Sequence, residues 1–448
     1  MDGDRGRDGT GGARLGMDHL AVVALTLLVG GSVIALVGQH TAAQAGPAIV
    51  LSLLLAALGA GLVLCCLQDL VLRLPAADGL YGLLAASWGP RVAVVLGAIL
   101  LLELMATTAG AAQSMARHVH AVLATGGLHA NDWLPVQVAA AVGLLMLTAL
   151  ALLPPRGVAL AACALLTVKI GVGVLLLALA ARHVHYGHWV PWLPPATAPY
   201  RFGLGGVLAA AVPLLGIFAS VGLALGFPAL RRQGAMWQPA VLALVSLLAM
   251  LLLIVLAALQ AGLVEFSALA STRPLAVALQ VHPQLQWMLP LLPLAGAAGL
   301  AALQLVLLML AVRLATSLWL RAADAAGRSR TRLSAMVVGL PAVMLVLWLP
   351  QGTLPALPGP ATLVVMAALC LAVLRRRDDA RQGAAGCGLL PGPATLVVMA
   401  ALCLAVLRRR DDARQGAAGC GLMMSMLAPL AAALCVLAAL ERLRAWPG

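Results

Sequence analysis

Charged residues are scarce in this chain. Asp, Glu, Lys and Arg make up 10% of its 448 residues, aromatic residues make up 4%, and the mean hydropathy is +1.03. Soluble globular domains carry about 25% charged residues and about 45–50% apolar ones, whereas 63% of this chain is apolar. The balance excludes a soluble globular domain and predicts an all-α polytopic integral membrane protein embedded in a lipid bilayer.

Several functional signals are also missing. Most of the eight cysteines lie within or beside apolar segments, as small buried side chains do, which argues against a disulfide framework. We find no Ser/His/Asp arrangement, no zinc-protease pattern and no phosphate-binding loop, because the glycines at Gly203-x-Gly205-Gly206 do not follow a strand. The sequence therefore predicts no enzyme activity and no cofactor. The polar segment 1–18 lacks the pattern of a cleavable signal peptide and is expected to be a tail.

Long apolar runs fill the rest of the chain and predict about 12 transmembrane helices. No large soluble domain fits between them. The predicted spans are 19–38, 47–72, 91–116, 135–154, 157–181, 204–228, 236–260, 287–312, 333–350, 355–374, 388–407 and 422–440.

The arginines set the predicted orientation. If the N-terminus is cytoplasmic, most arginines around the first ten spans fall on the cytoplasmic side, where basic residues concentrate in membrane proteins. The exceptions are Arg117, Arg182, Arg201 and Arg273. The net charge of +13 is therefore explained by topology and does not indicate nucleic-acid binding. We expect a multi-pass protein of the cell membrane with a cytoplasmic N-terminus.

Near its C-terminal end the chain contains a tandem duplication. Residues 357–389 recur letter for letter as 390–422, a period of 33 residues. If the second copy spans the membrane, its arginines Arg408–Arg410 fall on the outer side, against the positive-inside rule. The alternative is a second copy that is re-entrant or lies along the interface; a spanning copy is favoured.

Two spans carry helix-weakening residues near their middle. In the first span these are Gly30, Gly31 and Ser32; in the sixth they are Pro213, Gly216 and Gly222. Interrupted segments at corresponding places in two halves of a chain point to a transporter binding site. For the first span, the alternative is close helix packing through small residues.

A series of short motifs resembles one family of transporters. In order along the chain, they are Gly46-Pro47-Ala48 with Ser52, Asp69-Leu70 with Arg73 and Pro75, Gly79 with Tyr81, Leu102-Glu103-Leu104, Trp189-Val190-Pro191-Trp192 and Val373-Leu374 followed by Arg375–Arg377. Together they resemble the amino acid–polyamine–organocation transporters, and within them the cationic amino acid transporter branch. The resemblance covers roughly residues 25–380. The chain departs from the family pattern in the third glycine of the first helix, in the sixth-helix motif and in the acidic pair that follows that motif.

The resemblance implies two five-helix halves related by an inverted repeat. The first half would be 19–182 and the second 203–374, followed by C-terminal helices in 375–448. It also implies a substrate site, with Gly30, Gly31 and Ser32 near the carboxylate of an amino acid and a facing wall formed by Phe218, Ala219 and Ser220. The alternative is that these six are ordinary packing residues.

Two charges lie deep within predicted spans. Lys169 is the only lysine in the chain, and Glu103 lies in the third span. Charged residues inside a membrane are costly, so each is a functional hypothesis. By resemblance, Lys169 stands where sodium stands in sodium-coupled relatives and would load and release a proton. Glu103 would share in this coupling, or would pair with Lys169 or with a cationic substrate. The alternatives are a permanently charged strut for Lys169 and a neutral acid bonded between helices for Glu103.

Histidines are frequent in two segments expected to be outer loops. They are His118, His120 and His129 in one loop, and His183, His185 and His188 in the next. Such a pattern is compatible with zinc binding or pH sensing. Solvated loop positions are the commoner explanation, and no metal site is expected.

These observations favour a secondary active transporter of amino acids, cationic ones included, or of related amines. Its partners would be the small-molecule substrate and protons, and it would work by alternating access around the first and sixth spans. The rival hypothesis is a non-transporting membrane subunit, or a degenerate paralogue, derived from a transporter.

Overall fold

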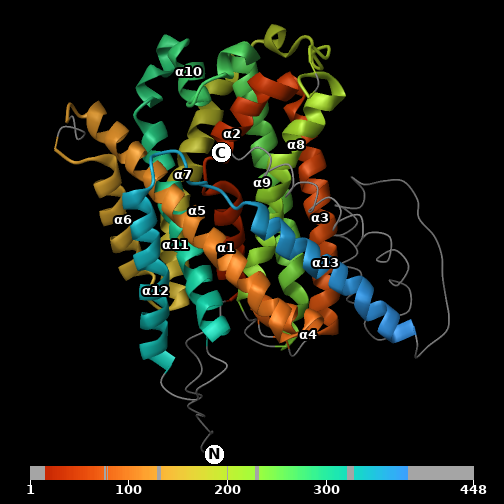
Figure 1. The fold of residues 1–448 in the computed structure, drawn as a ribbon. Helices are drawn as coiled ribbons and strands as arrows, with labels where there is room; N and C mark the ends of the chain where they lie inside the picture. Colours follow the sequence, from red (N-terminus) through yellow and green to blue (C-terminus); the bar gives the residue numbers. More distant parts are fainter. Residues whose placement is uncertain are drawn as a thin grey trace, which may run out of the picture.

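The computed structural model describes residues 16–74, 77, 79–128, 133–198, 200–227, 232–319 and 327–381 (Figure 1). Apart from one isolated bridge between Ala198 and Arg201, the regular structure of these residues is helical. The α-helices are α1 (Met17–Val29), α2 (Val33–His40), α3 (Ile49–Arg73), α4 (Gly79–Trp88), α5 (Pro90–Thr125), α6 (Val136–Leu150), α7 (Pro155–Ala180), α8 (Gly203–Ala219), α9 (Arg232–Leu263), α10 (Pro274–Gln280), α11 (Leu291–Trp319), α12 (Gly327–Trp348) and α13 (Pro360–Arg381).

The prediction of an all-α polytopic membrane protein is confirmed. Six helical stretches of the described residues are long and apolar enough to cross a membrane, and the first of them, Met17–Arg73, contains both α1–α2 and α3. Each of the first ten predicted spans coincides with a helix or a helix pair. The predicted spans 388–407 and 422–440, and with them the second copy of the duplication, lie outside the described residues.

The first span is interrupted where its glycines predict. α1 ends at Val29, α2 begins at Val33, and Gly30–Ser32 form an irregular link between them. The sixth span differs in detail from the expectation. α8 continues through Pro213, and only at Ser220 does it tighten into a 3₁₀ helix, Ser220–Gly226. A proline inside a helix removes one backbone hydrogen bond, and here the helix continues beyond that defect.

α11 forms the centre of the bundle. It packs against α5, α7, α12 and α1, and most of its length is buried. A second layer packs α3 against α8 and α9. Leucines on the outer faces of other helices are exposed, such as Leu102 on α5 (65%) and Leu160 on α7 (63%). Exposed leucines on long apolar helices fit contact with lipid.

α5 is longer than the sequence analysis expected. It runs without a break to Thr125, so His118 and His120 lie on a helix and the prediction that they belong to a loop is wrong. The physical reason is that no glycine or proline occurs between Arg117 and Gly126 to end the helix. His129 lies outside the described residues.

The connector between α12 and α13 comprises residues 349–359 and passes across the bundle. In Figure 1 it crosses the bundle beside α5, and α13 begins about half-way along the depth of the bundle. The last residues of this connector therefore approach the interior of the protein.

Candidate substrate and coupling site

Lys169 lies near the middle of α7 and reaches the interruption of the first span. Its Nζ donates hydrogen bonds to the carbonyl oxygen of Gly30 at 2.9 Å and to that of Gly31 at 2.6 Å. Backbone groups at a helix end lack intrahelical partners, and such groups are costly inside a membrane. The ammonium therefore satisfies two carbonyls at the C-terminal end of α1, where the helix dipole favours a cation.

Gly299 of α11 makes this approach possible. A Cβ atom at Gly299 would lie 2.9 Å from the Nζ of Lys169 and 2.7 Å from the carbonyl oxygen of Gly30. The sequence analysis missed this residue. Its signal is the run Gly296-Ala297-Ala298-Gly299, a small-residue spacing typical of close helix packing in membranes.

Two leucines cover Gly31. A Cβ atom built on Gly31 would lie 2.5 Å from Cδ2 of Leu357 and 3.2 Å from Cδ2 of Leu303. Leu303 belongs to α11, whereas Leu357 belongs to the connector before α13. Ser32, the third predicted residue of this group, is partly buried, and its hydroxyl makes no capping bond to α2.

The predicted facing wall lies at the change from α8 to the 3₁₀ helix. Phe218, Ala219 and Ser220 are buried, and the hydroxyl of Ser220 donates to the carbonyl of Ile217 at 2.6 Å. α1 packs against both α8 and the 3₁₀ helix. The structure therefore brings the two interrupted spans together.

Glu103 does not pair with Lys169, and the expected ion pair is wrong for the described residues. Its carboxylate accepts hydrogen bonds from the backbone N–H of Ala361 at 2.6 Å and from that of Thr362 at 2.9 Å, and also from the Thr362 hydroxyl. These groups form the first turn of α13, where the helix dipole favours an anion. The Glu103 carboxylate thus bonds α5 to the N-terminal end of α13, whereas the Lys169 ammonium bonds α7 to the C-terminal end of α1.

The histidines are distributed over several elements. Nδ1 of His118 bonds to the carbonyl of Ser114 at 2.8 Å, and its ring packs against Gly296. The rings of His183 and His282 lie 5.4 Å apart, and those of His185 and His188 lie 5.5 Å apart. Within the ranges that the structure describes, no three His, Cys, Asp or Glu side chains are grouped to hold a metal ion.

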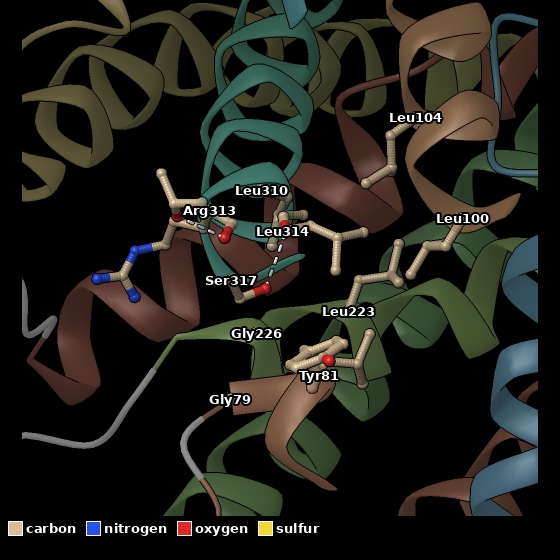
Figure 2. Close-up of a pocket in the computed structure, with 12 residues that line it drawn as sticks. Gly79, Tyr81, Leu100, Leu104, Leu223, Gly226, Leu310, Arg313, Leu314 and Ser317 are labelled. Atoms are coloured by element: carbon tan, nitrogen blue, oxygen red, sulfur yellow. Dashed lines mark hydrogen bonds between the residues drawn. The ribbon is translucent and has the colours of Figure 1, made fainter. Parts of the chain in front are cut away.

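A separate cavity of about 250 Å³ lies near α4, towards one end of the bundle. Its walls come from α4, α5, α11 and the 3₁₀ helix of the sixth span. Figure 2 shows Tyr81 facing the leucines of α5 and α11, whereas the side chain of Arg313 runs away from them. The guanidinium of Arg313 lies 5.0 Å from the ring centre of Phe227. The sequence analysis did not single out this cavity.

Solved structures with a similar fold are membrane transporters. A Na⁺-coupled sialic acid symporter in a substrate-bound outward-open state matches with a TM-score of 0.56 and 12% identity, over 96% of this chain and 91% of that one. A manganese transporter of Eremococcus coleocola, solved as two mutants, matches with a TM-score of 0.51 and 15% identity, over 100% and 98% of the two chains. No protein-family model matches the sequence, and no curated protein matches it either. The chain is therefore a multi-pass helical membrane protein whose fold is shared with transporters.

Proposed function

We propose that the chain is a proton-coupled secondary active transporter of amino acids or related amines, as its resemblance to the amino acid–polyamine–organocation transporters implies. The observation that carries the proposal is the contact of the Lys169 ammonium with the carbonyls of Gly30 and Gly31. Discontinuous helices with exposed carbonyls near mid-membrane are typical of ion and substrate sites in transporters. The fold shared with two transporters supports the transporter part of this proposal.

Lys169 is the proposed coupling residue. Its protonated form ties α7 to the end of α1 through two hydrogen bonds. Loss of the proton removes the positive charge that those carbonyls and the dipole of α1 stabilise. α1 is then less strongly held to α7, which couples proton release to movement of the first span in alternating access.

The substrate binds between the two interrupted spans in this proposal. The freed N–H groups at Gly31 and Ser32, at the start of α2, suit a carboxylate. The carbonyls of Gly30 and Gly31 already accept from Lys169, so the substrate's ammonium is assigned to the facing wall at Phe218, Ala219 and Ser220. Glu103 is assigned no part in binding the substrate, because its carboxylate is bonded to the start of α13.

The proposed architecture has two inverted halves, 19–182 and 203–374, with a cytoplasmic N-terminus in the cell membrane. The interruption after Val29 and the helix change after Ala219 fall in the first span of each half, which supports this division.

The deciding experiment measures uptake of a labelled amino-acid panel into proteoliposomes, with and without an inward proton gradient. We expect saturable uptake that the gradient stimulates, and loss of that stimulation in Lys169→Ala. Arg156→Ala is the matched control, because it removes an exposed cation from the same helix. If folded wild-type protein takes up nothing, the non-transporting subunit is the better description; unaltered pH dependence in Lys169→Ala would overturn the coupling role.

A further inference from the structure

We infer that the substrate of this site is a small amino acid with a neutral, apolar side chain, and that Leu357 determines this specificity. The inference rests on the proposed function and names its substrate class. It is carried by the contact of Leu357 and Leu303 with Gly31 and by the partners of Glu103.

Two leucines shape the wall at the interruption. Leu357 and Leu303 place methyl groups directly against Gly31, the residue whose backbone is proposed to bind the substrate. Gly30 is equally confined, because a Cβ atom there would lie 3.2 Å from both Cβ of Leu303 and the carbonyl oxygen of Gly299. A substrate held at this backbone meets apolar carbon atoms on that side and finds little room.

Contacts with α5 hold Leu357 in place. Gly110 has no room for a side chain, since a Cβ atom would lie 2.7 Å from the carbonyl carbon of Pro355 and 2.9 Å from the carbonyl oxygen of Leu354. One end of the connector is bonded by Gln113, whose Nε2 donates to the carbonyl of Leu349 at 3.3 Å.

The other end of the connector is fixed by Glu103, which bonds the first turn of α13 and leaves no space for a side chain at Gly359. α5 therefore fixes the connector on both sides of Leu357. This makes Leu357 a defined part of the wall rather than a residue of an unattached loop.

The charges around the site disfavour a cationic substrate. Glu103 is the one acidic residue in the interior of a membrane-crossing helix among the residues that the structure describes; Asp69 lies in the last turns of α3 and is bonded to Arg73. Both oxygens of Glu103 already accept hydrogen bonds from α13. The protonated Lys169 is thus the charge beside Gly30 and Gly31, and a cationic side chain there would be repelled by it and left without a partner.

The test is a competition assay in proteoliposomes with labelled alanine. For wild-type protein we expect glycine and unlabelled alanine to compete at least tenfold better than lysine or arginine, with leucine and methionine in between. Leu357→Ala should improve competition by leucine and methionine at least fivefold and should raise the KM for alanine with little change in maximal rate. Leu357→Asp should improve competition by lysine and arginine.

Leu371→Ala is the control, because it is the same change on an exposed face of α13. Thermal unfolding in detergent identifies any variant that has lost its fold. If Leu357→Asp does not fold, the result for Leu357→Ala decides the test. The inference is overturned if wild-type protein prefers lysine or arginine, or if Leu357→Ala keeps the wild-type order of competitors. Absence of all uptake by folded wild-type protein would instead overturn the proposed function, and the inference with it.

Discussion

The end of α1 and the start of α13 solve the same physical problem with opposite charges. At the end of α1, the Lys169 ammonium donates to two carbonyls; at the start of α13, the Glu103 carboxylate accepts from two backbone N–H groups. The end of α1 and the start of α13 both lie inside the bundle, where unpaired backbone groups are costly. Each charge also has the sign that the adjacent helix dipole favours.

The difference between these two regions concerns what each charge holds. Lys169 bonds an irregular link between two short helices, and Gly299 packs closely against both Lys169 and this link. Glu103 bonds the regular first turn of a long helix and is supported by the hydroxyl of Thr362. A charge at a helix interruption inside the bundle suits coupling, whereas a charge at a regular helix start acts as a cap. A charge within a membrane-crossing helix is therefore not by itself enough to identify a coupling residue.

The largest effect that tests this comparison is expected for Gly299→Ala. The added Cβ atom would lie 2.9 Å from the Nζ of Lys169, so the ammonium must move away from the interruption. We expect gradient-stimulated uptake to fall at least tenfold while the protein remains folded. Gly173→Ala on α7 is the matched control, because a Cβ atom there meets open space. Equal uptake by the two variants would show that the Lys169 contact is not needed.

The next largest effect is expected on stability, for Glu103→Ala. Its loss leaves the N–H groups of Ala361 and Thr362 without their acceptor, and an unsatisfied buried group costs about 1–3 kcal/mol. We expect a lower unfolding temperature, with Glu103→Gln intermediate because the amide keeps one acceptor oxygen. Proton stimulation of the remaining folded protein should persist. Loss of stimulation in Glu103→Gln at an unchanged unfolding temperature would instead support the coupling role that the sequence predicted.

These two regions also show which features of the structure can be predicted from the sequence. Apolar run lengths predict the first ten spans, because a membrane-crossing helix has a narrow range of lengths. Gly30 and Gly31 predict the first interruption, since glycine weakens a helix wherever it stands. Both are local properties of the chain, and local properties are readable from sequence.

The partners of the two charges inside the bundle are distant in sequence. Lys169 and Gly30 are 139 positions apart, and Glu103 and Thr362 are 259 positions apart. The sequence suggested that Glu103 pairs with Lys169 or with a cationic substrate, but packing brings each of the two charges to a helix end. The position of Leu357 also depends on distant contacts, those of the connector with α5. The sequence of the connector does not reveal these contacts.

A smaller effect is expected for Thr362→Val, which removes only the hydroxyl from the cap of α13. The two backbone donors keep their bonds to Glu103, and the loss of one hydrogen bond costs about 0.5–1.5 kcal/mol. The unfolding temperature should therefore fall by less than in Glu103→Ala. A double variant that is no less stable than Glu103→Ala alone would show that the hydroxyl acts through Glu103; fully additive losses would contradict this.

The smallest effect is expected for Asp69→Asn at the end of α3. Nε of Arg73 donates to Oδ2 of Asp69 at 2.8 Å, and the two residues stand at the (i, i+4) spacing on α3. Helix pairs in contact with water contribute about 0.3–0.5 kcal/mol and weaken with salt. Asp69→Asn should barely change the unfolding temperature, and less so at high salt. A loss as large as that of Glu103→Ala would mean that the last turns of α3 are not in contact with water, and that the distinction between a solvated pair and a buried cap does not hold.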